Sequence, residues 1–452
     1  LGGEEPLLAV STRLAYLPSV GQSMRNVLII SPRFPPVNAP DLHRVRHSLP
    51  YFEELGWQTE TWRVDPDLVE QKRDPLLTRT LPDEAIVRTV GAFDPEWTRL
   101  VALGSLALRS LPFYFWRVTQ RLMKGDVNLV YFSTTAFPVM ILGRYWKWRF
   151  GIPYVIDMQD PWHSEYYVGK PKDEQPPKFW FSYRLHKYLE PIAMRSVDGI
   201  ISVSQGYCDT LCERYDNVTH DMCRVIPFGA AEMDFEVMED SDVTQPFVDS
   251  FDDTIDVVYA GRGGYDMATA ARGIFEALAQ GLRERPSIYE RVHLHFVGTS
   301  YAPAGEGEKT LEPIAEEHKV ANAVTEHTDR IPYFQSLRLL RDADHLIIPG
   351  SDDPDYTASK LYPYILSRRP VLAVFNENSS VVDILRRTNA GTAVTFTDNT
   401  EMSTLAEHVY NAWTPMLERL PYTPETDWGA FQPYTAKAMA QRQIEVFDRV
   451  AR

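Results

Sequence analysis

The sequence predicts an α/β protein with two doubly wound, mainly parallel sheets, each covered by helices on both faces. Three observations predict this class. Short apolar runs of strand length alternate with helix-length amphipathic stretches. The alternation occurs twice, on either side of an acidic, poorly periodic piece at 230–254. A chain of 452 residues is also too long for one ordinary domain.

In the first half, the apolar runs are nearly continuous, as expected for strands buried on both faces of a parallel sheet. Glycines end two of the helical stretches, at Gly56 and Gly151. The expected strands are 26–31, 58–64, 127–133, 154–158 and 199–204, and the expected helices are 43–56, 139–151 and about 180–195.

The second half repeats the scheme, and its expected strands are 255–261, 291–298, 345–350 and 371–375. Two Rossmann-like domains facing each other across a cleft follow from this pattern, and ligands of such sheets bind beyond the carboxyl ends of the strands. The expected divisions are an N-terminal extension at 1–24, a first domain at 25–229, a linker region at 230–254, a second domain at 255–430 and a helix within 431–452 that packs back on the first domain.

The longest apolar run, 100–116, contains Arg109 and Pro112 and is slightly short for a membrane span. We expect a packed helix that is interrupted at Pro112. No stretch resembles a secretory signal peptide.

The composition limits the classes of ligand and binding partner that we expect. A net charge of −16 disfavours general nucleic-acid binding, which needs positive surface. The three cysteines, Cys208, Cys212 and Cys223, provide no disulfide framework and fit a reducing compartment such as the cytoplasm. Together with His220 they match no common zinc spacing, so no metal site is expected.

A glycine-rich turn follows the strand expected at 255–261. Gly261, Gly263 and Gly264 would let the backbone approach an anionic group near the start of the next helix. Arg262 in the same turn could bind a diphosphate through two parallel hydrogen bonds. An ordinary tight turn with a solvated arginine explains the residues equally well.

Polar residues also follow the strand expected at 345–350. Lys360 would present a charge toward the same cleft as Arg262, and Thr357 or Ser359 could cap the helix that follows. The alternative is an ordinary capped helix with a surface lysine.

The stretch YVIDMQDPWHSEYY (154–167) places acids, a histidine and aromatics after a strand. Asp157 and Asp160 could form an acid–base pair, or they could hydrogen-bond within the turn at Pro161. We favour a loop that lines the cleft, with Asp160 and His163 facing substrate.

Asn38, His43, Arg44 and Arg46 follow the first expected strand. They are candidates for acceptor contacts, and a solvated helix face is an equally good interpretation.

Cations and aromatics are mixed in FYFWRVTQRLMK (113–124) and RYWKWRF (144–150). Such composition suits the surface of an anionic membrane, although tryptophans packed on the sheet would give the same pattern. Peripheral contact at the inner face of the membrane is therefore left open.

Several motifs together resemble glycosyltransferase family 4, whose members are retaining GT-B enzymes. The motifs are ISPRFPP with the later LPYFEELGW, YVIDMQDPW, VIPFGA, YAGR and SKLYPYILSRRPVLAV, and the resemblance runs in order over about residues 26–450. YVIDMQDPW is similar to the D-x-R-D-P-W element of one branch of that family.

The resemblance implies a nucleoside diphosphate sugar as donor, held mainly by the second domain, and a glycan or lipid-linked acceptor held mainly by the first. It implies no metal and no cofactor besides this co-substrate. It assigns Arg262 to neutralising the departing diphosphate, and we expect Lys360 to supply the second charge. The cleft residue Asp160 is a further catalytic candidate, although the resemblance assigns it no established role as a base. The implied donor-binding residues are Gly261, Gly263, Gly264, Asp355, Tyr356, Thr357, Ser359 and Leu361. The implied sugar or acceptor contacts are Asp157, Gln159, His163, Asn38, His43 and Arg44.

Three positions depart from the family pattern. The lysine expected five residues after Arg262 is Met267, the second of two glutamates is Pro363, and the histidine before Asp160 is Gln159. The expected function is sugar transfer in polysaccharide or glycoconjugate synthesis. The alternatives are a non-catalytic GT-B scaffold and a nucleotide-sugar epimerase of related fold.

Overall fold

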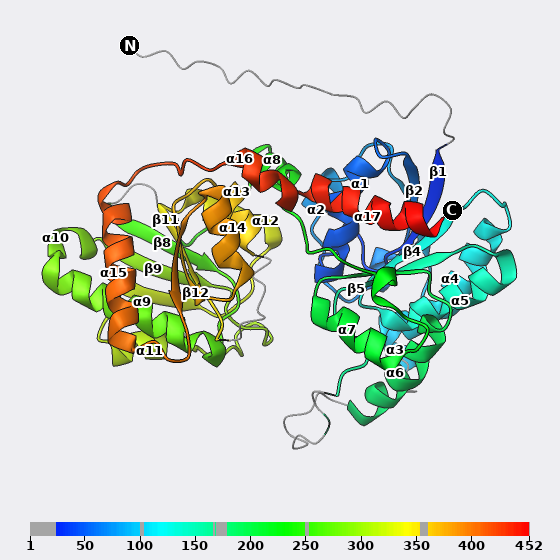
Figure 1. Cartoon of the computed structure of the whole chain (residues 1–452), viewed down its shortest axis with the longest axis horizontal. Coiled ribbons are helices and arrows are strands. Elements are labelled where there is room, and N and C mark those ends of the chain that lie inside the picture. The colour runs from blue at the N-terminus through cyan, green and yellow to red at the C-terminus, as the bar shows by residue number, and fades with distance from the viewer. Residues whose placement is uncertain are drawn as a thin grey trace, which may run out of the picture.

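The computed structural model describes residues 24–99, 104–165, 168, 179–248, 253–352 and 360–451 (Figure 1). Within these residues the chain forms one seven-stranded and one six-stranded sheet, and every strand pair is parallel. The α/β class with two doubly wound sheets is therefore confirmed. We refer to the bodies around the two sheets as the first and second domain.

The first sheet has the order β3-β2-β1-β4-β5-β6-β7. Its strands are β1 (Arg25–Ile30), β2 (Trp57–Val64), β3 (Ile86–Val90), β4 (Leu129–Ser133), β5 (Tyr154–Met158), β6 (Gly199–Ser202) and β7 (Cys223–Val225). Its helices are α1 (His43–Phe52), α2 (Leu76–Arg79), α3 (Pro95–Arg99), α4 (Leu106–Leu122), α5 (Ile141–Phe150), α6 (Phe179–Met194) and α7 (Gln205–Arg214). The strand order reverses between β1 and β4, which is where such sheets bind ligands.

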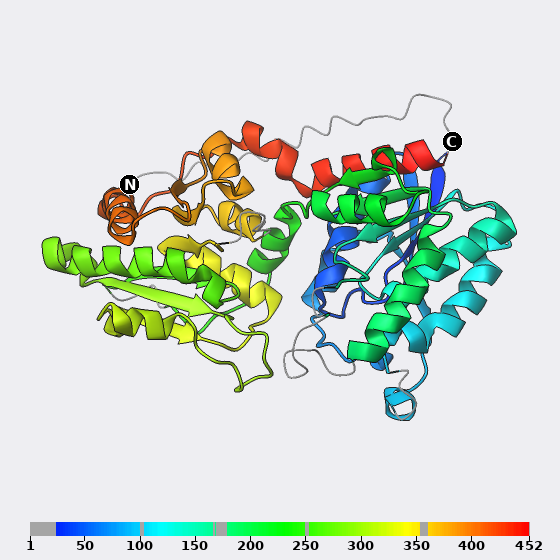
Figure 2. The same ribbon diagram turned by 60° about the horizontal axis from the view of Figure 1, so that its bottom comes forward.

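The second sheet has the order β10-β9-β8-β11-β12-β13 and reverses between β8 and β11. Its strands are β8 (Ile255–Ala260), β9 (Val292–Val297), β10 (Val324–His327), β11 (His345–Pro349), β12 (Val371–Asn376) and β13 (Thr392–Phe396). Its helices are α9 (Ala268–Glu284), α10 (Pro286–Tyr289), α11 (Glu312–Glu317), α12 (Tyr333–Asp342), α13 (Leu361–Leu366), α14 (Ser380–Thr388) and α15 (Met402–Glu418). Figure 2 shows its strands pointing toward the first domain.

The expected interruption of the apolar helix at Pro112 is wrong. Helix α4 continues through Pro112 as one 17-residue helix. Pro112 cannot donate to the carbonyl of Leu108, but its position is exposed, so water can bind that carbonyl instead.

Two chain crossings connect the domains. The first contains α8 (Glu232–Glu239), a helix that the sequence did not predict, and the second contains α16 (Trp428–Phe431) before α17 (Ala436–Val450). The crossings are hydrogen-bonded to each other, because Ala230 N–H donates to Tyr434 O at 2.8 Å and Ala436 N–H donates to Ala230 O at 2.7 Å. A Cβ on Gly229 would lie 2.8 Å from the backbone of Ala436, so this close approach requires glycine.

Helix α17 returns to the first domain and packs along α1. Gln443 Nε2 donates to Ser48 Oγ at 2.6 Å, and Trp57 Nε1 donates to Asp448 Oδ1 at 3.0 Å. The ring of Phe447 lies 5.6 Å from Trp57 and 5.0 Å from Tyr131, centroid to centroid. The last helix of the chain therefore completes the core of the first domain.

A buried ion pair lies where the domains meet. Arg46 of α1 pairs with Asp234 of α8, and both side chains are fully buried. Tyr333, at the start of α12 in the second domain, donates its hydroxyl to the same carboxylate at 2.5 Å. His43 Nδ1 lies 2.8 Å from Arg46 Nη2, and His47 Nε2 lies 3.1 Å from Asp234 Oδ2. We call these five residues the junction cluster.

Charge and burial set the protonation of the junction cluster. Burial raises the pKa of Asp234, but the attraction of Arg46 and His47 and the hydrogen bonds from both together hold it well below its usual value. Burial and Arg46 hold the pKa of His43 well below its ordinary value, so His43 is a neutral acceptor. The cluster is thus a charged pair surrounded by neutral groups.

Replacement of Asp234 by alanine should leave Arg46 buried without its partner. We expect it to lower the free energy of unfolding by about 3–5 kcal/mol in urea denaturation. The double variant Arg46→Met/Asp234→Leu should lose less, because it removes both charges. Asp383→Ala is the matched control, since the exposed Asp383–Arg387 pair should contribute less than about 1 kcal/mol. An equal loss in Asp234→Ala and the control would contradict the prediction.

Candidate functional site

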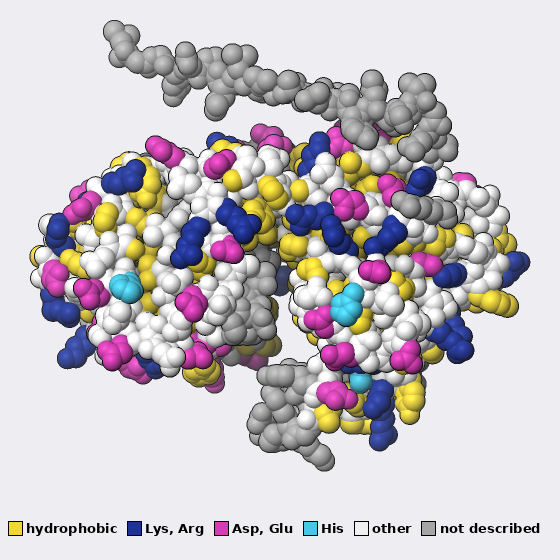
Figure 3. Space-filling model, viewed as in Figure 1, with side chains coloured by type: hydrophobic (Ala, Val, Ile, Leu, Met, Phe, Trp, Pro, Cys, Tyr) yellow, Lys and Arg dark blue, Asp and Glu magenta, His cyan; other side chains and the backbone are white. Residues whose placement is uncertain are grey.

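The two domains are separated by an open cleft below their junction (Figure 3). The glycine-rich turn follows β8 at the strand-order reversal of the second sheet. Gly261 N–H donates to Val297 O at 3.0 Å, and Gly263 N–H donates to Thr299 O at 2.7 Å. These bonds hold the turn against the loop that follows β9.

Lys360 lies directly against this turn. A Cβ on Gly261 would be 2.9 Å from Lys360 Nζ and 2.6 Å from the Tyr259 hydroxyl, so only glycine leaves room for the ammonium group. Lys360 Nζ is buried and has no hydrogen-bond partner among the described residues. The interpretation of Lys360 as a surface lysine is therefore wrong.

Three cations converge around the turn. Burial, together with the charges of Arg330 and Arg262, lowers the pKa of Lys360 to about 7. Arg330, in the loop after β10, also lies 4.5 Å from the ring centroid of Tyr301. A buried ammonium without a partner, repelled by two guanidinium groups, is the arrangement that an anion would stabilise.

Arg262 is ion-paired rather than simply solvated. Its two terminal nitrogens donate to Asp266 at 2.9 and 2.6 Å, and Ser351 Oγ, which follows β11, donates to Asp266 at 2.7 Å. These bonds keep the pKa of Asp266 below its usual value. The Asp266 carboxylate thus bridges the loops after β8 and β11 and orients Arg262. Met267 is fully buried beside it.

Four of the expected donor-binding residues, Asp355, Tyr356, Thr357 and Ser359, lie outside the described residues. Leu361 is buried at the start of α13. Tyr364 on the same helix accepts a hydrogen bond from Ala260 N–H at 2.8 Å, which fixes α13 to the end of β8. Pro363 lies inside α13.

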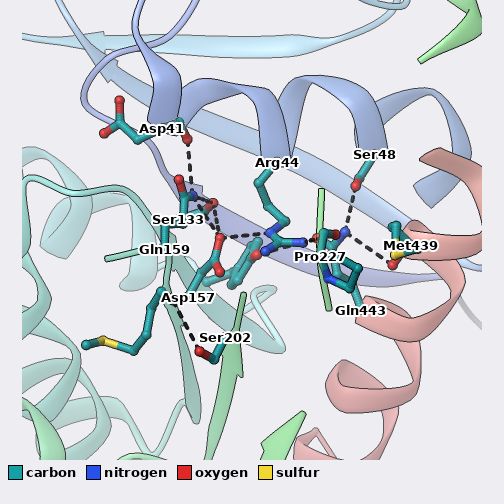
Figure 4. A network of polar contacts seen from close by, with 12 residues as sticks. Asp41, Arg44, Ser48, Ser133, Asp157, Gln159, Ser202, Pro227, Met439 and Gln443 are labelled. Atoms are coloured by element: carbon teal, nitrogen blue, oxygen red, sulfur yellow. Dashed lines mark hydrogen bonds and ion pairs between the residues drawn. The ribbon is translucent and has the colours of Figure 1, made fainter. Parts of the chain in front are cut away.

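In the first domain, Asp157 at the end of β5 is the centre of a buried network (Figure 4). Its Oδ2 accepts from Ser133 Oγ at 2.8 Å, from Gln159 Nε2 at 2.8 Å and from Arg44 Nε at 3.1 Å. Arg44 Nη1 also donates to Pro227 O at 2.8 Å. The structure therefore brings Asp157, Gln159 and Arg44 together, and they bind one another. Their contact with a sugar or acceptor stays a prediction.

The interpretation of Arg44 and Arg46 as a solvated helix face is wrong. Both side chains are buried, and each is paired with a carboxylate distant in sequence, Asp157 and Asp234 respectively. His43 from the same helix belongs to the junction cluster, where its ring lies 5.0 Å from that of Tyr333.

Asp160 is exposed in the loop that follows β5. Partial burial raises its pKa, Asp41 raises it further, and Arg33 opposes both. Arg33 Nη2 lies 3.1 Å from Asp41 Oδ2 and donates to Thr135 Oγ1 at 2.8 Å. Arg33, Asp41 and Thr135 were not among the expected site residues, although they follow β1 and β4 at the strand-order reversal.

His163 and Asn38 lie apart from the Asp157 network. The ring of His163 lies 4.9 Å from that of Tyr183, and its backbone N–H donates to Glu190 at 2.9 Å. Burial and the charge of Arg214 lower its pKa. Asn38 donates its backbone N–H to Lys72 O at 2.8 Å in the loop before α1. Within the described ranges, no three His, Cys, Asp or Glu side chains are grouped to hold a metal ion.

Residues 76–230 match the model of the family described as Glycosyltransferase Family 4. The match lies in the first domain, and over these residues it confirms the resemblance that the motifs indicate. No curated protein matches the chain.

Solved structures share the fold over nearly the whole chain. HepE of Anabaena, in complex with UDP and glucose, is 15% identical, covering 93% of this chain and 99% of that one, with a TM-score of 0.53. Sucrose-phosphate synthase of Thermosynechococcus elongatus is 15% identical, covering 94% and 98%, with a TM-score of 0.55. The UDP-forming α,α-trehalose-phosphate synthase of Burkholderia xenovorans is 12% identical, covering 95% and 99%, with a TM-score of 0.55. The likeness establishes the two-domain GT-B fold.

The lowered pKa of Lys360 predicts a pH-dependent anion affinity. Lys360 loses its proton between about pH 6 and about pH 9. The wild type should bind pyrophosphate more tightly than Lys360→Met at the lower pH, and the ratio of the two affinities should fall about tenfold or more over this range. Calorimetric titration of both proteins measures this ratio, in which the ionisation of pyrophosphate cancels. Lys309→Met, at an exposed lysine paired with Glu312, should follow the wild-type curve. A constant ratio across this range would contradict the assignment.

Proposed function

We propose that the protein is a retaining glycosyltransferase that moves a sugar from a nucleoside diphosphate sugar to a glycan or lipid-linked acceptor. The observation that carries the proposal is the convergence of Lys360, Arg330 and Arg262 on the glycine turn at the strand-order reversal of the second sheet. This edge is where a doubly wound sheet binds a nucleotide. The positive charge there suits a diphosphate.

The proposed chemistry is stabilisation of a leaving group. As the bond from the anomeric carbon to the diphosphate oxygen breaks, negative charge grows on the diphosphate. Lys360 and Arg330 lie beside the turn. Among the described residues, no carboxylate is bonded to Lys360 Nζ. Arg262 is already held in place by Asp266. Oriented cations of this kind lower the barrier without reorganising during the reaction. We propose that these side chains, rather than a metal ion or another cofactor, neutralise the departing group.

Asp160 and the residues near it would form the opposite wall of the cleft. Its carboxylate is exposed and lies near Arg33 and Asp41 at the carboxyl end of the first sheet. We place the acceptor and the donor sugar against this wall, with the Asp157 network holding the wall rigid behind them. We also propose that the enzyme acts in the cytoplasm.

HepE binds UDP and glucose in its solved complex, so UDP-glucose is the first donor to test. In thermal unfolding, UDP, GDP or ADP should raise the midpoint temperature, because a ligand of the folded state stabilises it. The absence of a shift with all three nucleotides would contradict nucleotide binding.

Arg262→Ala and Arg330→Ala should each lower turnover about 10²–10³-fold, by loss of charge stabilisation in the transition state. The assay detects released nucleoside diphosphate in a screen of donors and acceptors. Arg283→Ala, on the exposed surface of α9, is the matched control and should keep wild-type turnover. Near-normal turnover of Arg262→Ala would rule out its assignment to the leaving group.

A further inference from the structure

Helices α4, α5 and α6 form a continuous outer surface of the first domain. Helix α5 packs against both α4 and α6. Figure 1 places α4 and α5 on the side of this domain that faces away from the second domain, with α6 at its lower end. This surface takes no part in the proposed site.

Large apolar side chains on this surface point into solvent. Trp148 is 78% exposed, Trp180 65% and Trp116 63%, although tryptophan is usually well buried. Tyr188 on α6 and Met123, directly after α4, are also exposed. The rings of Phe115, Tyr145 and Trp148 form a row from α4 to α5, with centroid separations of 5.0 and 6.0 Å. Exposed aromatics that form a row in this way mark an interaction surface.

The charge on these helices opposes that of the whole chain. The protein carries a net charge of −16, yet α4 and α5 contain no acidic residue and α6 contains one, Glu190. Glu190 is buried and paired with Arg214. The exposed cations on the three helices include Arg117, Arg149, Arg184 and Lys187.

Among the described residues, the carboxylates that border the surface include Glu165, which accepts a hydrogen bond from the Tyr183 hydroxyl at 3.5 Å, and two that are paired with cations. Asp126 is paired with Arg121 at 2.5 Å, and Asp198 is paired with Lys147 at 2.6 Å. The exposed cations named above are therefore available to an external anionic surface. We call the outward side of α4, α5 and α6 the aromatic–basic face.

A hollow of about 630 Å³ opens at one end of this face, between the last turns of α4 and α5. Leu122, Met123, Phe150 and Arg149 are among its lining residues. Its accessible lining is more polar than apolar and includes one cation, so it offers space for a lipid headgroup at this end of the face.

We propose that the aromatic–basic face binds the surface of an anionic lipid bilayer. Tryptophan and tyrosine favour the headgroup region, where the ring is buried and its polar atom stays hydrated, and Lys and Arg are attracted to anionic headgroups. None of the helices in the described ranges is long and apolar enough to cross a bilayer, so the contact is peripheral. The inference does not depend on the proposed chemistry, but it would bring the cleft to a membrane-borne acceptor.

Co-sedimentation of the full chain with vesicles tests the inference. The protein should bind phosphatidylcholine vesicles that contain phosphatidylglycerol, bind pure phosphatidylcholine more weakly, and dissociate as salt is raised. Arg117→Glu/Arg149→Glu should lower the partition coefficient about tenfold or more. Trp116→Ser/Trp148→Ser should lower binding to both kinds of vesicle.

The matched control for charge is Arg283→Glu/Arg386→Glu, which makes the same charge change on exposed positions of the second domain. The matched control for hydrophobicity is Ile86→Ser, at an exposed residue of β3. Both controls should bind as the wild type does. No binding to anionic vesicles, or an equal loss in the controls, would overturn the inference. So would self-association through this face without vesicle binding, seen by analytical ultracentrifugation.

The same variants separate this inference from the proposed function. Thermal shift with UDP reports the nucleotide site alone, and the variants of the aromatic–basic face should keep the wild-type shift. Vesicle binding without any nucleotide shift would contradict the proposed function and support the inference. The reverse result would overturn the inference and leave the proposed function supported.

Discussion

The buried pair of Arg46 and Asp234 is the interaction on which the arrangement of the two domains depends. A charge that is buried without its partner is costly, so this pair tolerates little displacement. Tyr333 extends the pair into the second domain, and the crossings at Ala230 and Ala436 are hydrogen-bonded to each other close by. Together they connect two sheets whose strand-end loops contribute to one cleft.

The polar residues of the two domains are organised in opposite ways. In the first domain, Asp157 Oδ2 accepts from Arg44, Ser133 and Gln159, so the charge of the carboxylate is offset by Arg44 within the network. In the second domain, Lys360 is buried with no such partner among the described residues and is repelled by two guanidinium groups. An incoming anion would supply the counter-charge that Lys360 lacks among the described residues.

The sequence predicted interior strands well and edge strands poorly. The expected strands correspond to interior positions of both sheets, where burial on both faces produces an apolar run. The missed strands β3, β7, β10 and β13 are the four sheet edges, which are short or partly exposed. Arg262 and Lys360 were found because each lies close to a recognisable strand or helix. Arg330 follows β10, so missing that edge also concealed the third cation.

Pairings between distant segments could not be predicted from the sequence. Arg44 and Arg46 resemble solvated cations because their carboxylate partners lie 113 and 188 residues away.

The position of Phe447 has a further consequence for biosynthesis. Trp57 and Tyr131 acquire their ring partner only when the last helix has left the ribosome, after the whole second domain has been made. This part of the core of the first domain therefore cannot be completed until the second domain has been translated.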